Sequence, residues 1–163
     1  MIDKARDIMT RKLIVVNENT TIDNLIRIFM ENNISCVPVV SDEMKLIGIV
    51  TKTDILGYLM DKDIHLSLKH VLQDIFEYRS EHGDKDREAP SETEITVRDI
   101  MTPNPITCGE KTSVTSMAKK MIKKKIHRLI ITRDNEIVGI VSTLDILYHV
   151  AGFKKMSEDN AIQ

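Results

Sequence analysis

Two short hydroxyl–carboxylate pairs have residue types and spacing that suit ligand chemistry. Thr51 precedes Asp54 and Ser142 precedes Asp145, each by three residues and each just before an apolar run. A carboxylate accepts two hydrogen bonds at once, which suits the neighbouring 2′- and 3′-hydroxyls of a ribose. The hydroxyl, one helical turn away, can reach a ribose or a phosphate. The same spacing is typical of a helix capping box. Local sequence favours the capping role, and the two roles are compatible.

Both pairs lie in a segment that occurs twice. Arg6–Thr10 recurs as Arg98–Thr102, 92 residues later, and Gly48–Leu56 recurs as Gly139–Leu147, 91 residues later. The one-residue difference falls most simply in a turn near residue 43, because a residue lost inside a strand would turn its side chains to the other face. The chain is therefore an internal duplication.

The elements that must position these pairs follow from the apolar spacing. Residues 22–30 and 114–122 have helical apolar periodicity, each after hydroxyl residues that can cap a helix. Apolar runs predict two hairpins, one from 36–40 with 46–50 and one from 129–131 with 137–141. A second helix opens near each aspartate. The predicted fold is α/β (α+β), with two β-α-β-β-α repeats packed with pseudo-two-fold symmetry and with ligand clefts that combine both repeats.

Composition excludes several classes of protein. With 23 Lys+Arg against 25 Asp+Glu, the net charge is −2, which argues against a dedicated nucleic-acid binder. No apolar run approaches the roughly 20 residues of a membrane span, and the first residues lack the apolar core of a secretory signal. Cys36 and Cys108 form no Cys-x-x-Cys motif and no disulfide framework. We therefore expect a soluble cytoplasmic protein.

The repeated motifs resemble a known family. Ile-Met-Thr at 8–10 and 100–102, the Pro-Val-Val strand, and Gly-Ile-Val-Thr-x-x-Asp-Ile-Leu at 48–56 are similar to the cystathionine β-synthase (CBS) domain. Two in tandem resemble a stand-alone CBS pair, or Bateman module. The expected boundaries are 1–60 for the first CBS domain, 61–94 for a helical and acidic connector, 95–151 for the second domain, and 152–163 for a tail. The resemblance implies a flat α/β pair, often dimerised, that senses adenine nucleotides or related adenosyl ligands.

The resemblance also implies roles for individual residues. In family members that bind adenine nucleotides, basic residues at the position of His127 and Arg128 contact phosphate, for which a guanidinium is well suited. The first repeat has Ser35 and Cys36 there, so we expect unequal sites. A run of lysines from 119 to 125 leads into this strand and is either a solvated helix face or an attractor for anions.

The resemblance further implies that each site combines an aspartate of one repeat with the opening segment of the other repeat. The Asp145 site is expected to borrow Thr10 and Ile14, and the Asp54 site to borrow Thr102 and Ile106. For the two isoleucines, a core position is an equally good interpretation. The full expected ligand-binding set is Thr10, Lys12, Ile14, Cys36, Val37, Pro38, Thr51, Asp54, Thr102, Pro105, Ile106, His127, Arg128, Ser142 and Asp145.

The expected function is therefore regulatory, not enzymatic, because we find no activated nucleophile and no cluster of metal-binding carboxylates. The module is expected to bind AMP, ADP, ATP, S-adenosylmethionine or NAD as a regulatory ligand, with no catalytic cofactor and no metal. It is expected to form a homodimer and to signal to a protein that the sequence does not identify, without membrane or nucleic acid. The alternative is a ligand-free dimerising scaffold that acts as a protein-interaction module.

Overall fold

The chain forms two compact units that do not coincide with the sequence repeats. The structure, a computed structural model, describes residues 3–61 and 95–153, so the predicted connector and most of the predicted tail lie outside it. The Asp54 unit is Val15–Pro103, and the Asp145 unit combines Met1–Ile14 with Asn104–Gln163. Each unit thus contains the body of one repeat and the opening segment of the other.

The Asp54 unit has a four-stranded mixed sheet of order β1-β2-β3-β4, in which only the β1–β2 pair is parallel. Thr21 Oγ1 caps α2 by accepting a hydrogen bond from Asn24 N at 3.3 Å. Leu25 and Phe29 of that helix are buried, as are Val37–Val40 of β2 and Val50 of β3. The elements are β1 (Val16–Asn17), α2 (Ile22–Glu31), β2 (Cys36–Val40), β3 (Leu46–Thr51), α3 (Lys52–Asp61), α5 (Val97–Ile100) and β4 (Thr102–Pro103).

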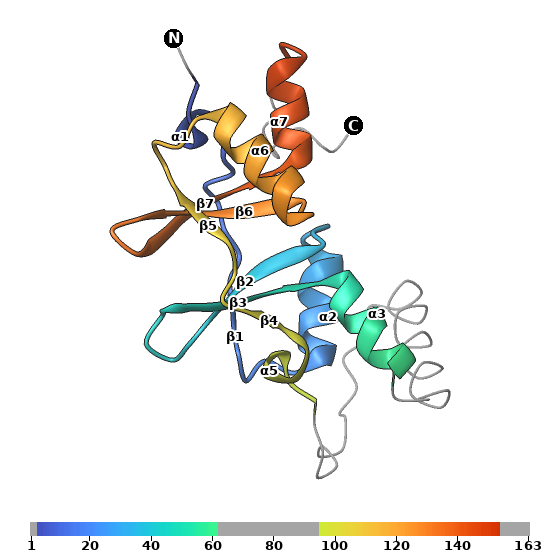
Figure 1. Cartoon of the computed structure of the whole chain (residues 1–163). Coiled ribbons are helices and arrows are strands. Elements are labelled where there is room, and N and C mark those ends of the chain that lie inside the picture. The colour runs from blue at the N-terminus through green and yellow to red at the C-terminus, as the bar shows by residue number, and fades with distance from the viewer. Residues whose placement is uncertain (1–2, 62–94, 154–163) are drawn as a thin grey trace. The chain divides into compact units, whose positions relative to one another are not determined.

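The Asp145 unit repeats this design with a three-stranded sheet of order β5-β6-β7. Ser113 caps its first long helix, α6, which ends at Lys125 in the left-handed conformation. α6 and α7 cover one face of the sheet (Figure 1), where Leu129 and Val141 pack with Met117 and other residues of one apolar cluster. The elements are α1 (Ala5–Ile8), β5 (Thr107–Gly109), α6 (Val114–Lys124), β6 (Arg128–Arg133), β7 (Glu136–Ser142) and α7 (Thr143–Val150).

The predicted order of strand, helix, strand, strand, helix is confirmed in both repeats, and so is the length difference in the hairpin turn. The β6–β7 turn needs only Asp134 and Asn135, both with positive φ, as a two-residue hairpin turn requires. The one-turn helices α1 and α5 were not predicted. A signal was present for α5, because Thr96-x-x-Asp99 forms a capping box in which Thr96 N donates to Asp99 Oδ2 at 2.8 Å.

Each opening segment is docked by the same backbone hydrogen bonds in both units. Ala5 N donates to Thr112 O at 2.8 Å, and 92 residues later Val97 N donates to Thr20 O at the same distance. The next amides continue the pattern, since Arg6 N donates to the carbonyl of Glu110 at 3.0 Å and Arg98 N to that of Glu18 at 2.9 Å. The duplication has therefore kept the docking geometry as well as the sequence motif.

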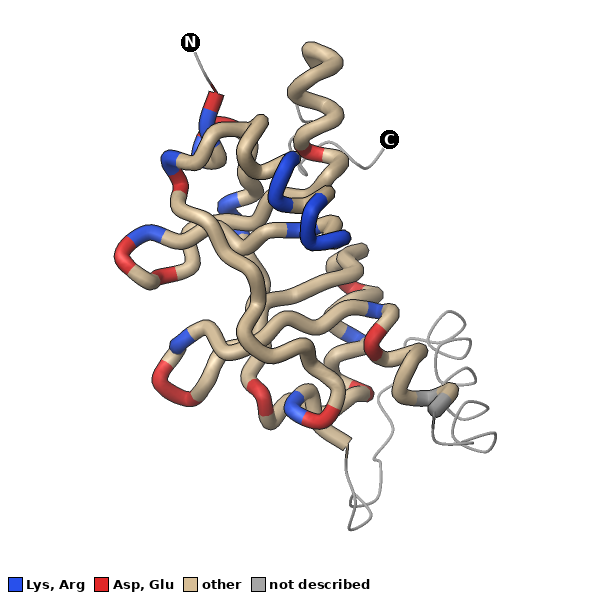
Figure 2. Tube along the Cα trace, viewed as in Figure 1, with Lys and Arg blue, Asp and Glu red and all other residues tan. Residues whose placement is uncertain are grey.

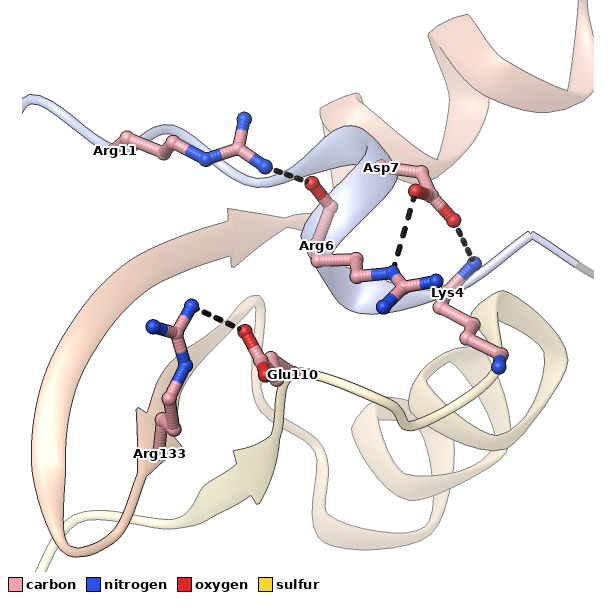
Figure 3. Close-up of polar contacts among 6 residues, drawn as sticks. All are labelled: Lys4, Arg6, Asp7, Arg11, Glu110 and Arg133. Atoms are coloured by element: carbon pink, nitrogen blue, oxygen red, sulfur yellow. Dashed lines mark hydrogen bonds and ion pairs between the residues drawn. The ribbon is translucent and has the colours of Figure 1, made fainter.

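Side chains reinforce the docked segment in the Asp145 unit (Figure 3). Lys4 N donates to Asp7 Oδ2 at 2.8 Å and closes the first turn of α1. Nearby, Arg133 donates to Glu110 Oε2 at 2.6 Å, and this hydrogen bond holds the pKa of Glu110 below its usual range. The backbone carbonyl of Glu110 accepts from Arg6 N of the docked segment, and its carboxylate accepts from Arg133 of β6. Glu110 therefore links the docked segment to the sheet.

A glycine substitution tests the local environment of α3. Gly57 lies in this helix, is exposed, and an added Cβ would meet nothing within 4 Å. We expect Gly57→Ala to raise the free energy of unfolding by about 0.5–1 kcal/mol, because alanine loses less backbone entropy in a helix. Urea unfolding followed by circular dichroism measures the change. A loss of stability would show that Gly57 has a neighbour or a conformation that the structure does not give it.

Candidate functional site

The two hydroxyl–carboxylate pairs form helix capping boxes. Ser142 N and Ser142 Oγ both donate to Asp145 Oδ2 at 2.7 Å, and Asp145 N donates back to Ser142 Oγ at 3.2 Å. Thr51 and Asp54 make the same three contacts at 2.7, 2.7 and 3.3 Å. The capping interpretation is thus confirmed. In both boxes the cap engages Oδ2, and a carboxylate has about four lone-pair positions over two oxygens, so capping does not exhaust its capacity as an acceptor.

Strand pairing determines which side chains share a face with Ser142. Arg128 pairs with Ser142 across β6 and β7. Thr10 pairs with Ile140, with Thr10 N donating to Ile140 O at 2.9 Å and Ile140 N to Thr10 O at 3.1 Å. Paired residues share a face, and so do residues two apart along a strand. Thr10, Arg128 and Ser142 therefore lie on one face, which we call the site face, opposite the face that packs against α6 and α7.

Backbone contacts place two further candidates beside this group. Thr143 N, at the start of α7, donates to the carbonyl of His127 at 2.9 Å. His127 is exposed and Arg128 is half-buried, whereas Asp145 is 8% exposed. The Asp145 unit by itself thus gathers a threonine from the first repeat with basic, hydroxyl and carboxylate groups from the second.

The Asp54 unit has the same site face with different side chains. Cys36 pairs with Thr51, and Thr102 pairs with Ile49, two residues before Thr51. Pro38 also pairs with Ile49 and shares this face. The amide of residue 52 donates to the carbonyl of residue 35 at 3.1 Å, and this hydrogen bond corresponds to the one from Thr143 N to the carbonyl of His127. At Asp54 both hydrogen bonds to the carboxylate end on Oδ2.

Two of the expected residues, Val37 and Ile106, lie apart from the site faces. Val37 alternates to the opposite face and is 0% exposed. Ile106 packs against the core of the Asp145 unit, whereas Thr102, its expected companion, belongs to the Asp54 unit. This packing favours the core interpretation of Ile106. Lys12 is exposed, and the last two candidates, Ile14 and Pro105, are half-buried. Their contribution to a ligand site stays a prediction.

Positive charge is concentrated in the Asp145 unit. Figure 2 shows blue along the C-terminal half of α6, and all five lysines there are exposed. The corresponding helix α2 carries Asp23, Arg27 and Glu31, so its charges alternate in sign. α6 runs directly into His127 and Arg128, and its lysines either form a solvated helix face or raise the local concentration of anions. Among the described residues of the Asp54 unit, no helix carries a comparable run of lysines.

Comparison with known proteins identifies the repeats. The family model of the CBS domain matches residues 5–61 and 97–152. The uncharacterized protein MJ1426 of Methanocaldococcus jannaschii is 31% identical over 149 residues, which cover 87% of this chain and 88% of that protein. No helix among residues 3–61 and 95–153 combines the length and the apolar character that crossing a membrane requires.

Solved structures show the same fold. The CBS domain pair of protein MJ0100, solved in complex with 5′-methylthioadenosine and S-adenosyl-L-methionine, is 25% identical with a TM-score of 0.66, covering 93% of this chain and 98% of that one. CBSX2 from Arabidopsis thaliana is 22% identical with a TM-score of 0.68, covering 93% of this chain and 96% of that one. The predicted tandem CBS architecture and α+β fold are thus confirmed.

The two cysteines are expected to react at different rates. Cys36 is half-buried on a site face, whereas Cys108 is buried. Burial raises the pKa of the Cys108 thiol above its usual value, and this effect exceeds the lowering by a hydrogen bond from Thr112 and by the charge of Lys120. Because the thiolate is the reactive form, we expect iodoacetamide at pH 7.5 to label Cys36 several-fold faster in the native protein. Mass spectrometry of the labelled peptides measures both rates. Equal labelling rates in the native protein, or faster labelling of Cys108, would contradict the burial of Cys108. A urea-denatured sample gives the labelling rates of both thiols without the fold.

Proposed function

Because the chain belongs to the CBS domain family, we propose that it is a regulatory sensor that binds adenosine-containing ligands and signals to a partner protein. In each unit the ligand lies on the site face, at the capping-box carboxylate. The observation that carries this proposal is the grouping of Thr10, Arg128 and Ser142 on one sheet face beside Asp145. Support for an adenosyl ligand comes from the MJ0100 pair, whose structure contains two such compounds.

The residues suit the parts of such a ligand. The carboxylate at the start of each second helix accepts hydrogen bonds from the ribose hydroxyls, since the two oxygens of a carboxylate offer about four lone-pair positions. Each unit takes its opening segment from the other repeat, and we call this the exchanged segment. Its threonine, Thr10 or Thr102, offers a side-chain hydroxyl at the neighbouring strand. In the Asp145 unit, Arg128 and His127 lie where an anionic substituent would be held by charge-assisted hydrogen bonds.

The two sites therefore take different ligands. The Asp145 site has two basic residues and the lysines of α6 nearby, so it binds a phosphate-bearing nucleotide such as AMP, ADP, ATP or NAD. The Asp54 site has Ser35 and Cys36 at the corresponding positions, which compensate no negative charge. It binds a phosphate-free adenosyl compound, such as 5′-methylthioadenosine or S-adenosylmethionine. One module of this kind reports on two metabolite pools.

Binding acts by a shift between conformational states. Each site combines residues from both repeats, so a ligand bridges the exchanged segment and the body of the other repeat. A ligand can favour one conformation only by its difference in affinity between the two, and such coupling is typically about 1–3 kcal/mol. The partner protein then binds one conformation in preference to the other.

A thermal-shift panel tests the proposal, with AMP, ADP, ATP, NAD, S-adenosylmethionine and 5′-methylthioadenosine on ligand-stripped protein. A ligand at 100 times its Kd adds about 2.7 kcal/mol of stability, which raises the Tm of a chain of this size by roughly 5–10 °C. Asp145→Asn keeps an acceptor for the cap but loses the charge, so we expect the shift from a nucleotide to fall sharply. Asp7→Asn is the matched control, because Asp7 is the capping-box carboxylate of α1 in the same unit.

A flat panel for the wild-type protein would contradict the proposal. A nucleotide shift that persists in Asp145→Asn and disappears in Asp7→Asn would contradict the assignment of the site.

Arg128 provides a test of the unequal sites. We expect Arg128→Gln to weaken the binding of AMP by about 10–100-fold, the value of a lost charged hydrogen bond, and to leave 5′-methylthioadenosine binding unchanged. Arg133→Gln is the control, because Arg133 lies at the other end of β6 and pairs with Glu110. Isothermal titration calorimetry measures both affinities. Two sites of equal affinity for every ligand would show that the charge difference does not determine their selectivity.

One observation favours a scaffold as the second candidate function. α7 and the residues after it leave large apolar side chains more than half exposed, namely Leu144, Leu147, Val150 and Phe153. Such a group of residues is typical of a protein–protein contact. A scaffold would show a concentration-dependent mass in multi-angle light scattering, no nucleotide shift, and no effect of Asp145→Asn beyond a small loss of stability.

A further inference from the structure

Two residues of the repeated motifs have no part in the proposed ligand contacts, and they meet at close range. A Cβ added to Gly139 would lie 2.5 Å from Met9 Sδ, 2.8 Å from Met9 Cγ and 3.1 Å from Met9 Cβ. In the other unit, a Cβ on Gly48 would lie 2.5 Å from Met101 Sδ. The methionine of each exchanged segment therefore packs directly on the strand glycine of the other repeat, in space that any larger residue would occupy.

The strands are shaped for this contact. The register between β6 and β7 shifts at Ile131 and Thr132, immediately next to the pairing of Ile131 with Gly139. The register between β2 and β3 shifts at Val39 and Val40, next to the pairing of Val39 with Gly48. A glycine beside a bulge is typical of a strand that another chain segment approaches closely.

The methionine and the site residue next to it point to opposite faces of the sheet. Met9 is 7% exposed and belongs to the apolar cluster under α6 and α7. Thr10, the next residue, pairs with Ile140 and lies on the site face with Ser142. Because neighbouring residues of an extended segment alternate between faces, the packing of Met9 on Gly139 fixes Thr10 on the site face without touching a ligand.

We propose that Met9 with Gly139, and Met101 with Gly48, are positioning pairs that hold the exchanged threonines at the two ligand sites. This inference rests on the proposed function for its ligand consequence, but its structural part stands without any ligand. The pairs set the spacing between the exchanged segment and the last strand of the sheet. They therefore determine whether Thr10 and Thr102 reach a ligand that the opposite repeat holds by its aspartate.

The two glycines differ in how well their surroundings tolerate an added methyl group. At Gly139 the added methyl group would meet Met9 as far back as its Cβ, which moves only with the backbone of the segment. At Gly48 the nearest atoms after Met101 Sδ are Met101 Cγ and the carbonyl oxygen of Thr102, both at 3.3 Å. The flexible end of Met101 can turn away. We therefore expect Gly139→Ala to displace its segment more than Gly48→Ala does.

Amide hydrogen exchange of the ligand-free protein tests the structural part. We expect Gly139→Ala to speed exchange at Thr10 and Ile140, whose amides donate to each other's carbonyls, by about fivefold or more, because displacement of the segment weakens these two hydrogen bonds. Exchange at Ile49 and Thr102, in the other unit, is expected to stay unchanged. Gly57→Ala is the matched control and leaves all four amides unchanged. Unchanged exchange at Thr10 and Ile140 in Gly139→Ala would overturn the inference.

Calorimetry tests the ligand part, with AMP for the Asp145 site and 5′-methylthioadenosine for the Asp54 site. We expect Gly139→Ala to weaken AMP binding about tenfold and to leave 5′-methylthioadenosine binding unchanged. The double variant Met9→Ala with Gly139→Ala removes the colliding Sδ and Cγ atoms and keeps the Met9 Cβ at 3.1 Å, so we expect it to recover part of the lost AMP affinity. A purely structural defect would not be relieved by a second truncation in the core.

The outcomes separate this inference from the proposed function. If Gly139→Ala speeds local exchange and wild-type protein binds none of the ligands, the proposed function fails together with the positioning role, while the packing pair itself stands. If wild-type protein binds AMP and Gly139→Ala binds it equally well, the proposed function stands and the positioning role is overturned. Selective loss of AMP binding with recovery in the double variant supports both.

Discussion

The backbone pairing between Thr10 and Ile140 is the interaction on which the Asp145 unit depends. It gives β7 a hydrogen-bonded neighbour along the side that β6 does not cover, so the strand that leads to Ser142 is no longer an open edge. The same role falls to β4 in the other unit, where Thr102 pairs with Ile49 of β3. Neither unit is complete without a segment from the other repeat, so the two repeats cannot be separated by cutting the chain between them.

The duplication kept backbone geometry and changed side chains. The docking hydrogen bonds, both capping boxes and both methionine–glycine contacts recur in the two units. The differences lie on the site faces and on one helix, where Arg128 corresponds to Cys36 and the lysines of α6 correspond to the mixed charges of α2. Packing and hydrogen bonding constrain the frame in both halves, because a small change there leaves a cavity or an unpaired polar group. Half-buried and exposed positions are less constrained, and the two units diverge there.

In the proposed sites, one carboxylate both caps a helix and accepts hydrogen bonds from the ligand. Asp145 Oδ2 accepts from both the backbone and the hydroxyl of Ser142, which fixes the carboxylate in one orientation before any ligand arrives. An oriented carboxylate loses little conformational entropy when it binds ribose hydroxyls, and this favours affinity. The two interpretations of the hydroxyl–carboxylate spacing are thus complementary.

The sequence by itself determined the duplication, the order of elements in each repeat, the helix caps and the family, because these depend on local periodicity and on motifs that repeat at a fixed offset. Resemblance to the family suggested which opening segment serves which aspartate. Thr10 pairs with Ile140 and Thr102 with Ile49, and their role at a ligand is a proposal. Only the tertiary structure decided that Val37 and not Cys36 faces the core, that Ile106 packs in a core, and that Met9 packs on Gly139. Face and close approach depend on strand register and on contacts between residues more than 100 positions apart, and neither leaves a periodic signal in the sequence.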